Sequence, residues 1–335
     1  MTLPGQEQCN PFAELLSSLS RVSSMLSIFT DESSDVHVKC LALCLSIAVL
    51  CFTVSSLTDN VSQVDKLWSI APCLYAWIAV RDTRTFIMAL LATSWGARLS
   101  YNFYRRGGYT FPYIWRGDED YRWPALRSGN LPYFGFLRRR IPWIVFNLIF
   151  ISLYQNILLL LIVSPSLVVW SAATYCPDTT PPFDVNGWDG VAIFLFVLFL
   201  CIETIADNQQ WKFQTEKYKR IHANQELAGD YKDGFCQSGL FAIVRKPNYA
   251  SEQAIWISYY LFSVAALNGS SVNWSMVGWV LLVLLFQGSG WITELLTERR
   301  HPSYAKYKER VPLYVPCFFS PALCVGKSRT KLKFA

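Results

Sequence analysis

The segment WDGVAIFLFVLFLCIETIADNQQ, residues 188–210, decides the fold class because it joins a long apolar run to a polar end. From Trp188 to Ala206 the residues are predominantly apolar, over a length that can cross the hydrocarbon core of a bilayer as a helix. Asp207 then opens a short tail of one acid and three amides. The segment therefore predicts a membrane-spanning helix that ends at a polar rim.

Similar apolar runs recur along the 335 residues, of which 52% are hydrophobic and only 16% are charged. This balance is too apolar for an ordinary soluble domain. Buried helices of a large soluble protein are the alternative, but so many long runs would need far more polar cover. We therefore expect an all-α, polytopic membrane bundle of about seven transmembrane helices, the second and sixth short enough to be tilted or partly interfacial. The runs cover residues 38–57, 67–80, 85–101, 141–163, 188–206, 254–267 and 274–292.

The distribution of Lys and Arg over the connections predicts the orientation. Residues 102–140 carry eight Arg and residues 207–249 carry seven Lys or Arg, whereas residues 164–187 carry none. Because basic loops face the cytosol, seven spans place the N-terminus on the lumenal side and the C-terminus in the cytosol. Arg81 and Arg84 fit this topology poorly, since it puts them on the lumenal side.

The N-terminal segment, residues 1–37, precedes the expected membrane domain of residues 38–320. It holds no recognisable cleavable signal peptide. Its apolar residues recur at helical spacing from Phe12 to Phe29. This spacing predicts an amphipathic helix that lies on the membrane surface or packs on the rest of the protein.

The C-terminal segment, residues 321–335, is a basic tail that places Lys331 and Lys333 at the fifth and third positions from the end. This arrangement is similar to the dilysine retrieval signal of endoplasmic reticulum membrane proteins, which must face the cytosol. A short basic tail can also bind anionic lipid. Together with the loop charges, it predicts a multi-pass protein of the endoplasmic reticulum membrane with a cytosolic C-terminus.

The Cys and His content does not favour a metal site. The ten Cys are scattered without a CxxC pair, and His37, His222 and His301 are the only His. Neither GxGxxG nor GxxxxGK[ST] is present, so a soluble-type nucleotide fold is not indicated. We expect membrane lipids and a lipid-like small molecule as partners, and no nucleic acid; the oligomeric state is not predicted.

Acidic residues at the cytosolic ends of the spans point to function, because topology does not require them there. Glu203 and Asp207 are four residues apart and therefore share one face of a helix. Pro247 followed by Asn248 is typical of a helix start, with Asn248 as N-cap and Glu252 one turn further. Positive-inside topology explains the neighbouring basic residues, but it does not explain these acids.

Basic and aromatic residues gather on the same side, which predicts a cytosol-facing mouth above a hydrophobic bundle. Diphosphate and ribose phosphate are bound by Arg forks and Lys point charges, whereas hydroxyl and carboxamide groups need carboxylate and Asn partners. The mouth therefore suits an anionic cofactor, and the bundle would admit an apolar substrate from the lipid.

Five strings in this order resemble the motifs of the DUF1295 proteins, a branch of the steroid 5-alpha-reductase C-terminal superfamily. They are VDKLWS, SWGARLSYNFYRR, GDEDYRWPALR, GLFAIVRKPNYASEQAIW and ERRHPSYAKYKERVPLYVP, and they extend from Val61 to Pro316. The resemblance implies about seven membrane helices, NADPH held from the cytosolic side, and reduction of a carbon–carbon double bond of a lipid-like or steroid-like substrate.

The resemblance also implies which residues hold the cofactor. Asp207, Gly239, Asn248 and Glu252 match position by position, while Glu203 stands where the steroid enzymes have Asn. The string departs from the family at Lys246, which replaces His, and at Ser251, which replaces Gly. The full candidate set for cofactor binding is Glu203, Asp207, Gly239, Arg245, Lys246, Asn248, Glu252, Arg299, Arg300 and Tyr307.

Reduction of a conjugated alkene needs an acid that meets the substrate's carbonyl oxygen as charge develops on it. Asp65, Tyr101 and Tyr104 are the candidate catalytic residues. Asp65 could instead form an interfacial pair with the adjacent Lys66, and the two Tyr could belong to an aromatic belt at the membrane surface.

Two other functions fit the same architecture, because fold alone does not fix function. One is an S-adenosylmethionine-dependent methyltransferase for lipid or prenyl-cysteine substrates, which Glu294 and Glu298 near the C-terminus would favour. The other is a non-catalytic membrane protein, which the substitutions at Lys246 and Ser251 would favour. Asn248 and Glu252 at the helix start favour the reductase.

Overall fold

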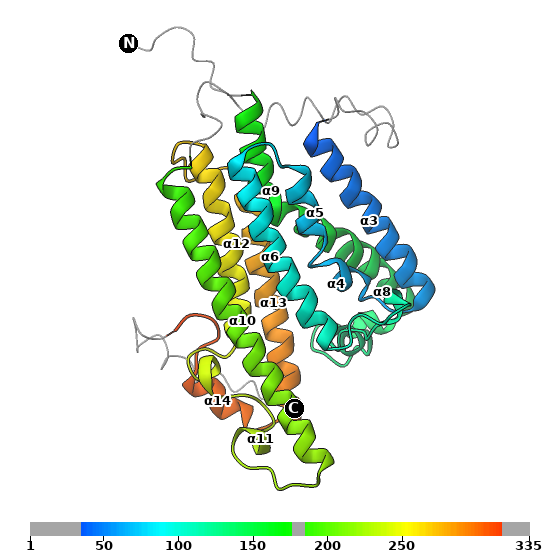
Figure 1. The fold of residues 1–335 in the computed structure, drawn as a ribbon. Helices are drawn as coiled ribbons and strands as arrows, with labels where there is room; N and C mark the ends of the chain where they lie inside the picture. Colours follow the sequence, from blue (N-terminus) through cyan, green and yellow to red (C-terminus); the bar gives the residue numbers. More distant parts are fainter. Residues whose placement is uncertain (1–34, 176–184, 317–335) are drawn as a thin grey trace. The chain divides into compact units, whose positions relative to one another are not determined.

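The computed structural model describes residues 35–175 and 185–316. Within these ranges the chain forms helices and no strand, which confirms the all-α class (Figure 1). The α-helices are α3 (Val36–Thr58), α4 (Gln63–Leu67), α5 (Ala71–Ile78), α6 (Thr83–Arg105), α7 (Arg122–Arg127), α8 (Arg140–Phe146), α9 (Gln155–Tyr175), α10 (Gly187–His222), α11 (Asp230–Asp233), α12 (Pro247–Ala266), α13 (Met276–Arg300) and α14 (Tyr304–Arg310). Short 3₁₀ segments are η1 (Ile114–Arg116), η2 (Gly135–Arg138) and η4 (Gly239–Ala242), and η3 (Asn147–Tyr154) is a π-helix that joins α8 to α9.

Four helical segments are long and apolar enough to cross a membrane, and all four coincide with predicted runs. They are Val36–Thr58, Arg140–Tyr175, Gly187–His222 and Met276–Arg300. The other three runs are helical too, in α5, α6 and α12, but α5 has only 8 residues, which is about 12 Å of helix. Four membrane-spanning candidates are therefore found in the described residues, and the seven-span topology stays a prediction. The predicted N-terminal amphipathic helix and the dilysine-like tail lie outside the described residues.

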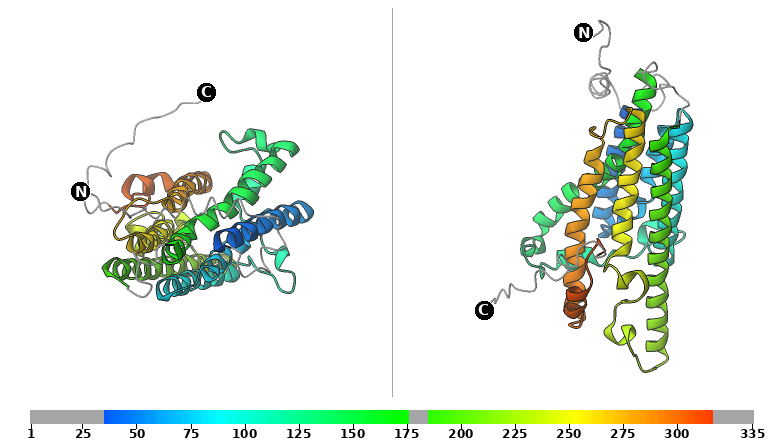
Figure 2. Two further views of the ribbon diagram at one scale, coloured as in Figure 1. Left: turned by 90° about the horizontal axis from the view of Figure 1, so that it is seen from above. Right: turned by 90° about the vertical axis from the view of Figure 1, so that its left-hand side faces the viewer.

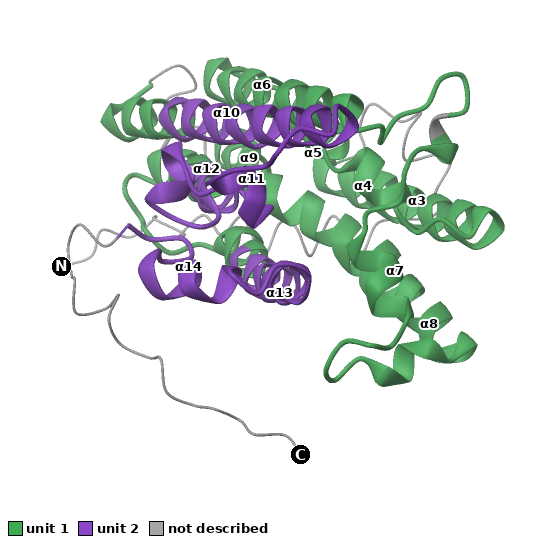
Figure 3. Cartoon of the chain, turned by 90° about the horizontal axis from the view of Figure 1, so that it is seen from below, with its two compact units in different colours: residues 1–196, 256–282 green, residues 197–255, 283–335 purple. Residues whose placement is uncertain are grey.

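The chain divides into two compact units (Figure 3). Unit 1 comprises residues 1–196 and 256–282, and unit 2 comprises residues 197–255 and 283–335. The boundaries fall within α10, α12 and α13, so each of these helices contributes one part to each unit. Unit 2 therefore combines segments that are far apart in the sequence.

Unit 1 is built around the packing of α3, α5, α6 and α9. Helices α3 and α9 lie side by side, as the blue and green helices in the left view of Figure 2 show. Helices α5 and α6 approach closely at Gly96, where a Cβ atom would overlap the Ser69 carbonyl oxygen and the Cys73 Sγ. The preceding Trp95 is fully buried and meets Trp256 edge-to-face, with 4.8 Å between the ring centroids. The string SWGAR thus combines a large core residue with a position that has no space for a side chain.

The same core contains hydrogen-bonded polar groups beside the π-helix η3. Asn147 Nδ2 donates to Ser55 Oγ at 2.9 Å, and Ser152 Oγ donates to Asn147 Oδ1 at 3.3 Å. Asn156 Nδ2 donates to the Ser152 carbonyl oxygen at 2.7 Å. All four side chains are buried. Inside an apolar bundle such groups are costly unless they are paired, and here they link α3 to α9 through η3.

Arg84, which fits the predicted topology poorly, is held in a buried ion pair. Arg84 donates to both carboxylate oxygens of Asp189, at 2.8 Å each. Arg81, nearby in the sequence, donates to Thr174 Oγ1 at 2.8 Å and lies over the Trp170 ring. A bidentate carboxylate partner neutralises Arg84 and offsets the cost of its burial. The pair ties the start of α6 to the start of α10 within unit 1.

We expect Gly96→Ala to lower the free energy of unfolding by about 1–3 kcal/mol, because the new methyl group meets a backbone carbonyl that cannot move aside. Thermal unfolding in detergent would show this as a lower midpoint. Gly190→Ala in α10 is the matched control, since nothing lies within 4 Å of its Cβ position. Alanine there should stabilise the helix by about 0.5–1 kcal/mol. Equal midpoints for the two variants would contradict the close approach of α5 and α6.

Candidate functional site

All ten predicted cofactor-binding residues lie in unit 2. They come from three places: the middle of α10, the segment from η4 to the first turns of α12, and the end of α13 with α14. The structure therefore brings into one compact unit residues that span about a hundred positions of sequence. The candidate catalytic residues Asp65, Tyr101 and Tyr104 lie in unit 1.

Three of the candidates are buried carboxylates. Glu203 and Asp207 expose 4% and 5% of their surface on α10, and Glu252 exposes 5% on α12. Each of the three carboxylates has a polar or electrostatic interaction with neighbouring groups. Glu203 and Asp207 are one helical turn apart and share a face, as the sequence predicts. Carboxylates are seldom this deeply buried unless they are paired or functional.

The start of α12 differs from its prediction by one position. The helix begins at Pro247, whose fixed backbone angle suits the first helical position, so Asn248 lies in the first turn and is not the N-cap. Asn248 is half-buried and Glu252 follows four residues later on the same face. Before the helix, the Lys246 ammonium lies 5.6 Å from the centre of the Tyr249 ring.

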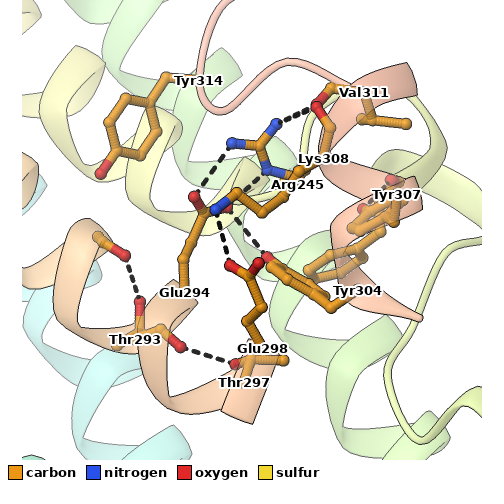
Figure 4. Close-up of polar contacts among 12 residues, drawn as sticks. Arg245, Thr293, Glu294, Thr297, Glu298, Tyr304, Tyr307, Lys308, Val311 and Tyr314 are labelled. Atoms are coloured by element: carbon orange, nitrogen blue, oxygen red, sulfur yellow. Dashed lines mark hydrogen bonds and ion pairs between the residues drawn. The ribbon is translucent and has the colours of Figure 1, made fainter. Parts of the chain in front are cut away.

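Arg245 is held by a network of contacts inside unit 2 (Figure 4). Its Nε and Nη2 donate to the two carboxylate oxygens of Glu294, at 2.5 and 3.1 Å. Its Nη1 donates to the carbonyl oxygens of Lys308 and Val311. The Glu294 carboxylate also accepts from the Tyr304 hydroxyl at 3.0 Å. This guanidinium is occupied by internal partners, so its role in the structure is to fix α14 and the chain after it.

Tyr307 is also held by contacts inside unit 2. Its ring is 2% exposed and its hydroxyl donates to the Phe241 carbonyl oxygen. Burial raises the pKa of Tyr307 above its ordinary value, so the hydroxyl stays protonated as a donor. Arg299 and Arg300 are exposed at the end of α13. Among the C-terminal candidates, these two arginines are the ones presented to solvent.

Gly239 has a backbone reason to be glycine. Its φ is +63°, in the region that favours glycine, and a Cβ there would overlap the side chain of Gln209. Gln209 Oε1 accepts from the Leu240 amide at 3.0 Å. This amide on α10, which follows Asp207 by two residues, thereby fixes the loop that leads to η4.

An open groove of about 460 Å³ lies along the polar end of α10 and was not predicted from the sequence. Arg220 stands over the Tyr231 ring at 4.4 Å and pairs with Glu216 at 2.9 Å. Tyr231 also stacks on Phe213, with 5.3 Å between centroids. The groove is lined by Trp211, Lys212, Thr215, Glu216, Arg220 and Tyr231. The spacing of basic and aromatic residues along one face of α10 could have indicated this groove from the sequence. The contribution of Tyr231 could not be predicted, because it depends on the fold.

Asp65 lies in a cluster of charged groups in unit 1. Its Oδ2 accepts from the Trp123 indole nitrogen at 2.9 Å. Burial raises the pKa of the Asp65 carboxyl, and the negative charge of nearby Asp120 raises it further. Although burial opposes ionisation of Asp120 as well, the Arg122 guanidinium lowers the pKa of Asp120 through hydrogen bonds of 2.8 and 3.0 Å. Two carboxyl groups with pKa values moved in opposite directions are typical of acid–base sites.

Tyr101 and Tyr104 are placed differently from Asp65. They expose 62% and 56% of their surface near the end of α6. Arg105 lies over the Tyr101 ring at 5.4 Å. Such exposure at the end of a helix is typical of an aromatic belt, which favours that alternative over a catalytic role for these two tyrosines.

A Ser–His–Asp arrangement at the other end of α3 escaped the sequence reasoning. His37 Nδ1 lies 2.6 Å from Asp35 Oδ1, and His37 Nε2 lies 3.1 Å from Ser171 Oγ. Ser171, however, is 1% exposed and donates to the Leu167 carbonyl oxygen of its own helix. The arrangement therefore ties the start of α3 to α9 and presents no accessible nucleophile.

Comparison with known proteins gives one family and one related chain. The model of the DUF1295 family, described as a protein family of unknown function, matches residues 51–311. A protein of Schizosaccharomyces pombe, described as uncharacterized, is 32% identical over 326 residues, which cover 92% of this chain and 88% of the relative. No solved structure matches.

Proposed function

The chain belongs to the DUF1295 family, and from this premise we propose that it is a membrane oxidoreductase that uses NADPH to reduce a carbon–carbon double bond of a lipid-like or steroid-like substrate. The observation that carries the proposal is the gathering of Glu203, Asp207 and Glu252, three buried carboxylates, in one unit with exposed arginines and lysines. Topology alone calls for the cations and not for the acids.

The donor and acceptor groups of unit 2 fit a dinucleotide phosphate in part. The carboxylates of Asp207 and Glu252 can accept hydrogen bonds from ribose hydroxyls. The side-chain carboxamide of Asn248 can pair with the amide of nicotinamide. Lys246, Arg299 and Arg300 offer cations for phosphates. Arg245 and Tyr307 do not fit this role, because both already bind internal partners. We therefore assign Arg245 and Tyr307 to the support of the site.

NADPH, when bound, would supply the reducing equivalent. The chain would supply the proton, for which Asp65 is the strongest candidate, because burial raises its pKa and so favours the protonated form. Trp123 would hold that carboxyl in position through its indole N–H. Helices apolar enough to sit in a membrane make contact with membrane lipids reasonable, and the substrate would enter from the lipid.

The methyltransferase alternative loses its main support in unit 2. Glu294 pairs with Arg245 and accepts from Tyr304, and Glu298 pairs with Lys308 at 2.9 Å. Both acids that favoured S-adenosylmethionine thus have internal cationic partners.

The remaining parts of the proposal are residence in the endoplasmic reticulum and seven spans with a cytosolic C-terminus. They rest on the loop charges and the Lys331–Lys333 tail.

Binding of NADPH should be visible as thermal stabilisation of the purified protein in detergent, since a ligand that binds only the folded state raises the midpoint by mass action. We expect NADPH at about a hundred times its Kd to add roughly 2.7 kcal/mol. Asp207→Asn and Glu252→Gln keep the side-chain shape and should reduce this stabilisation, because they remove the negative charge that accepts hydrogen bonds from the cofactor.

Two controls sharpen this experiment. Glu309→Gln changes an exposed acid of the same unit and should leave NADPH stabilisation unchanged. Unchanged stabilisation in both Asp207→Asn and Glu252→Gln would refute the site assignment. Stabilisation by S-adenosylmethionine and not by NADPH would refute the reductase and support the methyltransferase, and no response to either would support the non-catalytic protein.

A further inference from the structure

The end of the α6–α8 connection exposes apolar and aromatic side chains that water does not favour. Tyr133 is 86% exposed, Phe136 is 56% exposed, and Ile141 at the start of α8 is 75% exposed. These three residues lie within nine positions of sequence, on η2 and its flanks. Single exposed apolar residues are common, but a run of large ones at one place marks an interaction surface.

Three consecutive arginines accompany these residues. Arg138, Arg139 and Arg140 are all exposed. Within the described part of the chain, their guanidinium groups have no acidic partner, in contrast to Arg122 and Arg127, which pair with Asp120 and Asp59. A row of exposed cations without acids is complementary to an anionic partner.

Two of the three acids of the connection face the body of unit 1, whereas Asp118 is exposed beside Gly107. Glu119 accepts from the Val61 amide at 2.9 Å, and the Asp120 carboxylate pairs with Arg122. The backbone is fastened to the same place, because Asn60 donates to the Gly117 carbonyl oxygen and Ser62 Oγ accepts from the Asp120 amide, each at 2.9 Å. Glu119 and Asp120 thus have partners of their own and do not compete for Arg138, Arg139 and Arg140.

The position of these residues in the chain indicates how deep they would lie relative to a membrane. Arg140 is the first residue of the segment Arg140–Tyr175, which is long and apolar enough to cross a bilayer. Directly after it, Ile144, Val145, Leu148 and Ile149 are exposed apolar side chains, as a lipid-facing helix requires. A membrane span that begins at Arg140 would place the three arginines where the hydrocarbon core ends and the phosphate groups begin.

We propose that Tyr133, Phe136, Arg138, Arg139, Arg140 and Ile141 form a docking site for the headgroups of anionic phospholipids in the adjacent leaflet. Guanidinium groups bind phosphate oxygens in a bidentate manner, and Tyr and Phe rings settle at the headgroup level beside them. The predicted cytosolic side of this connection agrees with the site, because the cytosolic leaflet carries the anionic lipids. The proposal does not depend on NADPH or on any reaction.

The test follows thermal unfolding of the full chain in detergent while phosphatidylserine or phosphatidylcholine is added. We expect phosphatidylserine to raise the midpoint at low salt and phosphatidylcholine to do so much less. Each arginine near an anionic surface contributes roughly a fivefold change in affinity, so Arg138→Gln/Arg139→Gln/Arg140→Gln should weaken the apparent affinity for phosphatidylserine on the order of 100-fold. Arg139→Gln alone should weaken it about fivefold.

The control removes the same charge elsewhere. Lys219, Lys232 and Lys306 are exposed in unit 2, and their triple change to Gln should leave the affinity for phosphatidylserine within about twofold of the wild type. An equal loss in both triple variants would overturn the proposal in favour of general charge attraction. It would also be overturned if inorganic phosphate reproduced the stabilisation, which would indicate a free-phosphate site, or if both lipids stabilised equally.

Discussion

Arg245→Met is expected to destabilise unit 2 by about 3–5 kcal/mol, because it leaves Glu294 as a buried carboxylate without its cation. The effect should begin locally. Arg245 holds the carbonyl oxygens of Lys308 and Val311, so its loss should free α14 and expose the basic bonds there to trypsin. Thermal unfolding in detergent would report the loss of stability, and limited proteolysis would report the release of α14.

A weaker ion pair in the same unit serves as the control. Lys308 and Glu298 expose 36% and 39% of their side chains, so Lys308→Met should cost at most about 1 kcal/mol. The double variant Arg245→Met/Glu294→Gln should regain part of the stability, because no unpaired charge remains buried. If Arg245→Met were as stable as Lys308→Met, the guanidinium would be available for a ligand, and Arg245 would return to the cofactor-binding set.

The apolar runs predict most of the helices, because the length and hydropathy of a run are local properties. The run from Trp188 to Ala206 lies inside α10, and the run from Val38 to Leu57 lies inside α3. The continuation of α10 to His222 is also local, since polar residues can extend a helix beyond the membrane. What the runs do not predict is the division into two units, which passes through α10 itself.

The partners of the charged residues could not be predicted, because they depend on contacts between distant parts of the sequence. Arg245 and Glu294 are 49 residues apart, and Asp65 and Trp123 are 58 apart. Sequence shows that a cation stands near the membrane rim, but not whether an acid elsewhere occupies it. Arg84 illustrates this, since it fits the predicted topology poorly and its buried partner, Asp189, lies 105 residues away.

Asp65→Asn is expected to slow the proposed reduction by about 10²–10⁴-fold, the range typical for loss of a general acid. The measurement is NADPH oxidation by the purified protein with a steroidal or fatty enone. The wild-type rate should fall as pH rises through the raised pKa of Asp65, because only the protonated carboxyl can donate. The residual rate of the Asn variant should lack this dependence. Asp59→Asn, a change in an exposed acid close to Asp65 in the sequence, should leave the rate and its pH profile unchanged.

The stability of the folded protein should depend on pH with a defined sign, which follows from the raised pKa of Asp65. The pKa of Asp65 is raised in the folded state, so the stability of the wild type is complete below the ordinary pKa and declines as pH rises toward the folded-state pKa. The Asn variant lacks this decline and should be the more stable protein at neutral pH.

Trp123→Phe removes a hydrogen bond that favours the charged form of Asp65. This change should raise the pKa of Asp65 further and move the fall in rate to higher pH. A wild-type rate and pH profile in Asp65→Asn would exclude Asp65 as the proton donor, whereas a shifted profile in Trp123→Phe would show that the indole positions a titrating acid.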